Sequence, residues 1–315
     1  MKNTILKIAI ALLISSCSIA SIAQEQTMTL MLDWFVNPSH GPIIVAQQKG
    51  YFKEEGLNVV IQEPADPSLP PKLVAAGKLD LAVSYQNMLT INVAAGLPLI
   101  RSATLISTPL SALMVLDNGK IKTLADLKGK TIGISAPGDE DVMIGRQLKE
   151  VGLTMSDVKI VNVGWALSSS LASGKVDAIW GGFRNFEINE LALKGFKVIA
   201  FYPEEHGVPP YDELVFIANS KSYDAKKLKK FNHAIERASQ FIVNHPKVSW
   251  AIFKDYKPKV LDTKLNALAW DDSITRFALR PAAIDLGRYD LFAQFLFDHG
   301  LIKALPKAKD YVPVL

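Results

Sequence analysis

Short apolar runs alternate with segments of helical periodicity from residue 28 to residue 219, and this alternation limits the possible folds more than any other feature. The strand-sized runs, many rich in β-branched residues, lie at 28–32, 59–61, 81–84, 99–105, 113–116, 131–135, 158–163, 178–180, 197–201 and 214–219. The helix-period segments lie at 41–49, 70–76, 88–95, 141–151, 167–173 and 186–193. This pattern predicts an α/β fold with mainly parallel sheets and helices on both faces. Longer helices at 224–244, 246–256, 263–271 and 284–299 predict a helical C-terminal tail.

A six-residue pattern occurs twice and suggests two similar halves. Residues 75–80 read AAGKLD, and residues 172–177 read ASGKVD. In each copy a glycine ends a helix in the left-handed conformation and an aspartate begins a strand, although any helix-to-strand junction can use such residues. Turn-rich stretches near 117–120 and 206–211 predict two crossings between the halves. We expect one lobe at 24–117 and 211–315, a second at 118–210, and a hinge between them.

The first 23 residues have the layout of a secretory signal peptide. Two lysines lie within 1–7 with no acid, an apolar run fills 8–14, and small residues follow to Ala23. Cleavage after Ala23 is the expectation, and the alternative is a lipobox at 14–17 with Cys17 as the lipid acceptor. Cys17 is the only cysteine, so after processing we expect no disulfide, thiolate nucleophile or cysteine-ligated cluster.

Charge and motif content exclude several classes of function. The net charge of +4 is spread without a basic run, which predicts no nucleic-acid partner. No run of about 18 apolar residues is present, so an integral membrane protein is not expected. The five histidines lack metal-site spacing, and neither a G-x-S-x-G elbow nor a Walker phosphate loop occurs. We therefore predict no catalytic residue, no metal and no cofactor.

Several segments resemble a known family. Residues 47–57, 76–80 and 124–133 are similar to periplasmic solute-binding proteins of ABC importers, in the branch that serves sulfonates, nitrate and thiamin pyrimidines. Residues 32–40, 84–86 and 207–214 resemble the binders of thiamin pyrimidine precursors. The resemblance spans roughly 27–246. It implies a two-lobed periplasmic-binding-protein fold of type II, a pyrimidine ligand in the interlobe cleft, an ABC importer permease as partner, a monomer, and a periplasmic location.

Four aromatic residues follow predicted strands, at the positions where open α/β sheets bind ligands. They are Trp34, Tyr85, Trp165 and Phe183. Each alone could be a core or surface residue, but together they predict aromatic walls around a flat ligand.

Glu187 is the predicted carboxylate for the edge of the pyrimidine ring. It lies with Asn185 in the segment 183–187, which matches a family segment that supplies such a glutamate. A carboxylate can accept from an exocyclic amine and from a protonated ring nitrogen together. The alternative is a solvated acid in the first turn of a helix.

Further polar candidates surround this site. Asn37, Tyr211 and Glu213 are expected to support the ligand, with Glu213 the weaker candidate. The strand-to-helix loop from Ser135 to Asp139, which contains Pro137 and Gly138, has backbone N–H groups that could hold a polar substituent.

His40 separates two interpretations. Its neighbourhood resembles eukaryotic hydroxymethylpyrimidine-phosphate synthase, in which a histidine is consumed as substrate alongside pyridoxal phosphate. The synthase pattern also includes a cysteine cluster associated with iron, which the mature chain would lack. We therefore expect His40 to line the pocket or begin a helix in a non-enzymatic binder. Oxyanion binding through Arg184 remains an alternative, and the sequence leaves the particular thiamin precursor open.

Overall fold

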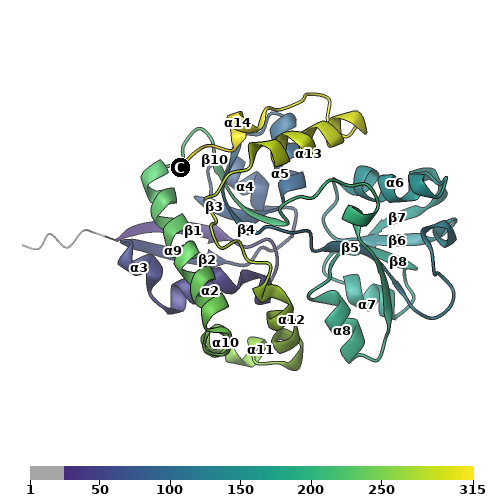
Figure 1. Ribbon diagram of the computed structural model, residues 1–315, viewed down its shortest axis with the longest axis horizontal. Helices are drawn as coiled ribbons and strands as arrows, with labels where there is room; N and C mark the ends of the chain where they lie inside the picture. The colour runs from purple at the N-terminus through teal and green to yellow at the C-terminus, as the bar shows by residue number, and fades with distance from the viewer. Residues whose placement is uncertain (1–24) are drawn as a thin grey trace, which may run out of the picture.

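Two five-stranded sheets form the framework of the computed structural model, which describes residues 25–315 (Figure 1). The predicted signal peptide and Cys17 lie outside the described residues. The first sheet contains β1 (Gln26–Met31), β2 (Leu57–Gln62), β3 (Leu81–Ser84), β4 (Leu99–Ile106) and β10 (Leu214–Asn219). The second contains β5 (Ser111–Leu116), β6 (Thr131–Ile134), β7 (Lys159–Asn162), β8 (Ala178–Phe183) and β9 (Val198–Phe201).

The two sheets have the same plan. Their strand orders are β2-β1-β3-β10-β4 and β7-β6-β8-β5-β9. In each sheet the first three strands of the order pair in parallel, and the fourth is antiparallel to both neighbours. The sheets are therefore mixed, with four strands of each running in one direction, as expected, and one running against them. The reason is that β5 and β10, each of which follows a crossing between the sheets, run opposite to both strands that they join.

The repeated six-residue pattern marks equivalent positions in the two sheets. Gly77 and Gly174 have φ values of +69° and +71°. The Asp80 carboxylate accepts the Thr29 N–H at 2.8 Å, and the Asp177 carboxylate accepts the Thr131 N–H at 2.9 Å. Each aspartate thus holds a threonine of a neighbouring strand, Thr29 within β1 or Thr131 at the start of β6.

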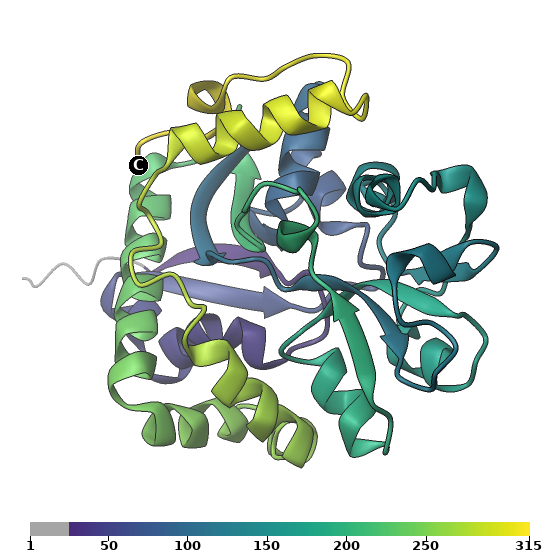
Figure 2. The same ribbon diagram turned by 45° about the vertical axis from the view of Figure 1, so that its right-hand side comes forward.

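Helices cover both faces of each sheet (Figures 1 and 2). Alternate residues of β10 point to opposite faces: Leu214 and Phe216 join one apolar cluster, while Val215 and Ile217 join another. The helices are α2 (Gly41–Gln48), α3 (Tyr51–Glu54), α4 (Pro70–Ala75), α5 (Gln86–Ala94), α6 (Glu140–Glu150), α7 (Leu167–Ala172), α8 (Glu187–Leu193), α9 (Ala225–Asn244), α10 (Pro246–Asp255), α11 (Pro258–Leu261), α12 (Lys264–Ile274), α13 (Leu286–Asp298) and α14 (Ala308–Tyr311). Short 3₁₀ turns lie at η1 (Pro38–His40), η2 (Leu124–Leu127), η3 (Met155–Asp157) and η4 (Pro203–Glu205).

The first crossing differs from the expected one. The chain passes between the sheets at 107–110, because β4 ends at Ile106 in the first sheet and β5 begins at Ser111 in the second. The polar stretch 117–120 is a turn that follows β5 and leads on to β6, so it stays within the half that contains the second sheet. Its composition marks a reversal of the chain rather than a crossing. The return runs between β9 and β10 and includes 206–211.

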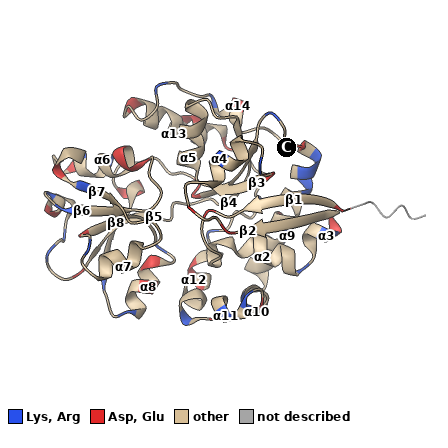
Figure 3. Cartoon of the chain, turned by 180° about the vertical axis from the view of Figure 1, so that it is seen from behind, with Lys and Arg blue, Asp and Glu red and all other residues tan. Residues whose placement is uncertain are grey.

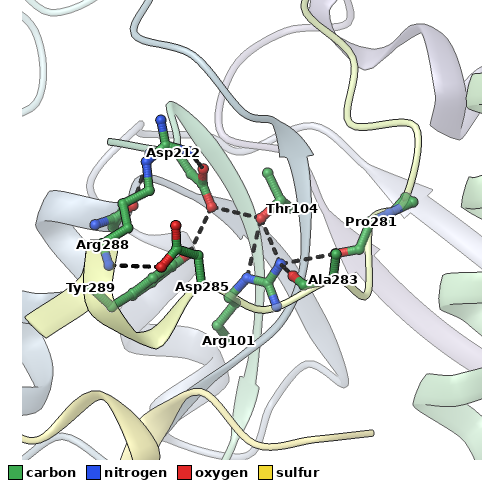
Figure 4. A network of polar contacts seen from close by, with 9 residues as sticks. Arg101, Thr104, Asp212, Pro281, Ala283, Asp285, Arg288 and Tyr289 are labelled. Carbon is green, nitrogen blue, oxygen red and sulfur yellow. Dashed lines mark hydrogen bonds and ion pairs between the residues drawn. The ribbon is translucent and has the colours of Figure 1, made fainter. Parts of the chain in front are cut away.

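A buried polar network joins the C-terminal helices to the first sheet (Figure 4). Arg101 is 2% exposed and donates to Thr104 Oγ1 and to the carbonyl oxygens of Pro281 and Ala283. Asp212 accepts from Thr104 Oγ1, from Arg288 at 2.8 Å and from the Tyr289 hydroxyl at 3.0 Å. These contacts fix α13 beside the segment that returns to β10.

Charged residues of both signs are distributed over the helices of both halves (Figure 3). Within residues 25–315, no helix is both long and apolar enough to cross a membrane.

Candidate functional site

A cavity of about 760 Å³, counting its open mouth, lies between the two sheets. Its wall is formed near the ends of β1, β3, β6 and β8 and by the crossing segments, as expected for open α/β sheets. The lining residues are Asp33, Trp34, Asn37, Tyr85, Asn87, Met88, Ser111, Ser135, Ala136, Asp139, Leu167, Trp180, Gly181, Phe183, Phe186, Glu187 and Glu213.

Six of the predicted site residues line this cavity. They are Trp34, Asn37, Tyr85, Phe183, Glu187 and Glu213. The Tyr85 and Phe183 rings meet edge to face, with centroids 6.4 Å apart. The Asn37 amide caps η1, because it accepts the Ser39 N–H and donates to the Phe35 carbonyl.

Glu187 begins α8 and is 8% exposed. Its Oε2 accepts the Phe183 N–H at 2.6 Å, and no described residue donates a hydrogen bond to Oε1. Burial raises the pKa of Glu187 to about 8, against the opposing effect of the Phe183 N–H. The site thus holds a carboxyl group that is largely protonated at neutral pH and has one oxygen without a protein donor.

Asp33 is held at the end of β1 by two donors. Its Oδ1 lies 2.8 Å from His40 Nε2, and its Oδ2 accepts from the Tyr85 hydroxyl at 2.9 Å. His40 Nδ1 accepts the Asn37 N–H at 3.2 Å, so Nε2 carries the ring hydrogen and donates it to Asp33. His40 is fully buried and begins the α2 region as expected, but it does not line the cavity.

Asp139 was not among the predicted site residues. It lies before α6 and accepts from Asn87 Nδ2 at 2.5 Å and from Trp180 Nε1 at 3.2 Å. Burial, helped by the Glu140 and Glu213 carboxylates, raises the pKa of Asp139 to about 7, against the opposing effect of the Trp180 and Asn87 donors. Asn87 begins α5 beside the first sheet, so its contact with Asp139 links the two sides of the cavity.

Ser135 was also missed as a site residue. It follows β6 and lines the cavity, and its Oγ is buried without a hydrogen-bond partner among the described residues. The only available signal was its place at a strand end, which many serines share.

Glu213 is fixed at the first crossing between the sheets. It accepts from the N–H groups of Leu110 and Ser111 and from the Ser111 hydroxyl. Burial raises its pKa, against the effect of these donors. Its carboxylate therefore joins the start of β5 to the start of β10.

An aromatic cluster lies at the side of the cavity. Trp165 is 41% exposed and does not line the cavity, but its ring meets that of Trp34 at 4.3 Å. Phe35 and Phe186 complete the cluster, with Phe35 6.0 Å from Trp165 and 6.3 Å from Phe186. Trp165 and Phe35 border a second hollow that shares Trp34 and Glu187 with the main cavity.

Two predicted site residues, Asn185 and Tyr211, have structural contacts in place of the expected ones. Asn185 donates to the hydroxyls of Ser39 and Ser273, at 3.1 and 2.7 Å, outside the cavity. Tyr211 is fully buried and packs on Phe292, with no hydrogen-bond partner for its hydroxyl among the described residues.

The loop at 135–139 lines the cavity with Ser135, Ala136 and Asp139 instead of the predicted Pro137 and Gly138. Pro137 and Gly138 do not line it. The Gly138 N–H is occupied by Glu140 Oε2 at 2.6 Å, so it is not free to hold a ligand substituent as expected.

Arg184 is turned away from the cavity. Its guanidinium donates to both carboxylate oxygens of Glu204, at 2.6 and 3.0 Å, and lies over the Tyr202 ring at 3.9 Å. Within residues 25–315, no group of three or more His, Cys, Asp or Glu side chains is arranged to hold a metal ion.

Comparison with known proteins gives a consistent assignment. Residues 37–249 match the family described as NMT1/THI5 like. The chain is 50% identical over 294 residues to a protein of Haemophilus influenzae named for thiamine biosynthesis, covering 93% of each chain. It is 32% identical over 240 residues to the formylaminopyrimidine-binding protein of Halalkalibacterium halodurans, covering 75% of this chain and 73% of that one.

A solved structure shows the same fold. The alkanesulfonate-binding protein of Xanthomonas axonopodis pv. citri, bound to MOPS, matches with a TM-score of 0.71 at 14% identity, covering 90% of this chain and 96% of that one. The expected periplasmic-binding-protein fold is thereby confirmed. Together with the sequence matches, this shows that the chain belongs to the NMT1/THI5-like family.

Proposed function

We propose that the protein is an extracytoplasmic binding protein that captures a thiamin pyrimidine precursor and delivers it to the permease of an ABC importer. The ligand would be the hydroxymethyl- or formylaminomethyl-aminopyrimidine. The observation that carries the proposal is Glu187, a buried carboxyl group at the cavity wall with Oε1 free of protein donors. The name of the Halalkalibacterium halodurans relative supports the same ligand class.

The edge of an aminopyrimidine matches this group. The exocyclic amine donates a hydrogen bond, and the adjacent ring nitrogen accepts one. A protonated carboxyl group offers one acceptor and one donor. Its carbonyl oxygen can accept from the exocyclic amine while its O–H donates to the ring nitrogen, so the carboxyl group and the pyrimidine edge pair when one of them carries a proton. The raised pKa of Glu187 favours this state at neutral pH.

The remaining wall suits a flat ring with one polar arm. Trp34, Tyr85 and Phe183 offer aromatic surfaces. The Ser135 hydroxyl lacks a partner and could donate to a hydroxymethyl or formyl oxygen. A buried hydroxyl gains most from a ligand that satisfies it, because leaving it unpaired is costly.

A binder fits these residues better than a synthase. The described residues that line the cavity include no lysine that could form a Schiff base with pyridoxal phosphate. The sequence has one cysteine, Cys17, and so offers no cysteine cluster.

Titration calorimetry with the two aminopyrimidines tests the proposal. We expect Glu187→Ala to weaken binding by about 10- to 100-fold, the worth of hydrogen bonds to an ionisable group. Glu205→Ala is the matched control, because Glu205 is exposed on η4 and lines neither the cavity nor the second hollow. Equal affinity in wild type and Glu187→Ala, or binding of sulfonate or nitrate alone, would contradict the proposal.

A further inference from the structure

We propose that this cavity excludes anions, so that it accepts the aminopyrimidine only as the free compound and rejects its phosphate ester. The inference rests on the function proposed above. It starts from the charges of the wall: four carboxyl side chains line the cavity, from Asp33, Asp139, Glu187 and Glu213. Of the residues that the structure describes, no lysine, arginine or histidine lines it.

The four carboxyl groups are held by neutral donors. Asp33 receives the Nε2–H of His40 and the hydroxyl of Tyr85. Asp139 receives an amide and an indole N–H, and Glu187 receives a backbone N–H. Glu213 receives two backbone N–H groups and a hydroxyl. None of these contacts supplies a cation. Glu187 is largely protonated at neutral pH, so the negative charge of the wall rests on Asp33, Asp139 and Glu213, and no cation among the lining residues offsets it.

The groups that could attract an anion are already occupied. Arg184 lies near Glu213 and opposes the burial that raises the pKa of Glu213, but its guanidinium is bound to Glu204. A helix N-terminus is the other common anion site. At α6 this position is taken by acids, because the Asp139 side chain lies there and Glu140 binds the Gly138 N–H. Figure 3 shows acidic residues at the starts of α6 and α8.

A phosphate group on the hydroxymethyl arm would therefore meet like charge without a compensating donor. Asp33, Asp139, Glu187 and Glu213 are buried, and charges on buried groups are screened less by salt than those at the surface. The sulfonate-binding fold neighbour shows that the same architecture can hold an anion, so the exclusion comes from this wall and not from the fold.

The experiment compares three ligands by calorimetry at pH 7.5. These are 4-amino-5-hydroxymethyl-2-methylpyrimidine, its phosphate ester and its acetate ester. The acetate ester carries an uncharged arm and separates size from charge. We expect the phosphate ester to bind at least 100-fold more weakly than the acetate ester.

Two variants locate the effect. Asp139→Asn removes one charge and keeps an acceptor for Asn87 or Trp180. The ratio of the dissociation constants of the phosphate and acetate esters should therefore fall at least tenfold. Glu213→Gln tests a second wall position in the same way. Asp141→Asn is the matched control, since Asp141 lies two residues further on, is exposed and does not line the cavity; it should leave the ratio unchanged.

The outcomes separate the two proposals. If the free alcohol binds and the two esters bind within tenfold of each other, the exclusion of anions is wrong and the proposed function stands. An unchanged ratio in both Asp139→Asn and Glu213→Gln would also overturn the exclusion. If neither the alcohol nor the acetate ester binds, the proposed function is wrong and the inference fails with it.

Discussion

The Nε2 atom of His40 lies 2.8 Å from Oδ1 of Asp33; both side chains are buried, and Asp33 lines the cavity whereas His40 does not. The Asn37 N–H occupies the other ring nitrogen, so the imidazole is fixed in one tautomer. Asp33 is held on its second oxygen by Tyr85, which itself lines the cavity. His40 therefore positions two cavity residues, Asp33 directly and Tyr85 through it.

We expect His40→Leu to weaken aminopyrimidine binding by about tenfold or more, because Asp33 would lose a hydrogen bond worth about 1.5–3 kcal/mol and could turn in the cavity. His40→Gln, which keeps a donor, should recover part of the affinity. Calorimetry measures both. His233→Leu is the control, since His233 lies on the surface and pairs with Glu55. Wild-type affinity in His40→Leu would show that Asp33 needs no such support.

The two tryptophans should contribute unequally. Trp34 lines the cavity, whereas Trp165 packs against Trp34 from outside it. Trp34→Ala should weaken binding by about 10-fold, since an aromatic pair contributes about 0.5–1.5 kcal/mol beyond its buried area. Trp165→Ala should have a smaller effect, because it loosens Trp34 without removing ligand contact. If the two variants lose equal affinity, the ligand ring contacts both Trp34 and Trp165.

The fold could be predicted from the sequence where the signal is local. Apolar runs of strand length and the repeated pattern ending in Asp80 and Asp177 are set by neighbouring residues, and both indicated two α/β halves. Strand direction is decided by long-range pairing. The sequence near β5 and β10 carries no local signal that these strands run antiparallel to their neighbours. The sequence near Ser111 likewise carries no signal that the second sheet begins there.

The site was predictable where function and strand ends coincide. Trp34, Tyr85 and Phe183 lie at or just after the ends of strands, Glu187 begins the helix that follows β8, and all four line the cavity. Asp139 was missed because its partners lie 52 and 41 residues away, so only the folded chain brings them together.

Asn185 was predicted as a site residue but does not line the cavity. A polar residue next to site residues can bind other parts of the protein instead of the ligand. The Asn185 amide joins Ser39 in η1 to Ser273 in α12, although its own segment follows β8 of the second sheet. It therefore holds the two sides of the cleft together.

We expect Asn185→Ala to favour a more open form, because the closed arrangement loses two buried hydrogen bonds of about 1 kcal/mol each. Small-angle scattering of the free protein should show a larger radius of gyration, and binding should weaken about 5- to 30-fold. Asn162→Ala is the control: Asn162 is exposed at the end of β7 and bonds only Gly164 locally. An unchanged radius and affinity would leave Asn185 without this role.

Glu187 should reduce stability while it serves binding. Burial raises its pKa to about 8, from an ordinary value of 4.5. Between these values the folded state keeps a proton that the unfolded state has released, so stability falls as the pH rises from about 4.5 to about 8 and is level above that. Glu187→Gln removes this loss. The free energy of unfolding of the variant, relative to wild type, should rise by a few kcal/mol across this window, as measured by urea denaturation. If the difference in the free energy of unfolding between Glu187→Gln and wild type does not change with pH, the pKa of Glu187 is not raised.

Ligand affinity should depend on the same proton. If Glu187 must be protonated to pair with a neutral aminopyrimidine, affinity is level just below pH 8 and falls about tenfold per pH unit above it, because the proton must then be taken up on binding. Glutamine has the shape and the donor and acceptor of a protonated carboxyl group but does not titrate. Glu187→Gln should therefore bind nearly as well as wild type at pH 7 and lose the decline above pH 8, whereas Glu187→Ala is weak throughout. Calorimetry from pH 6.5 to 9.5 distinguishes these curves. If Glu187→Gln is as weak as Glu187→Ala at pH 7, the ligand pairs with a carboxylate and carries the proton itself.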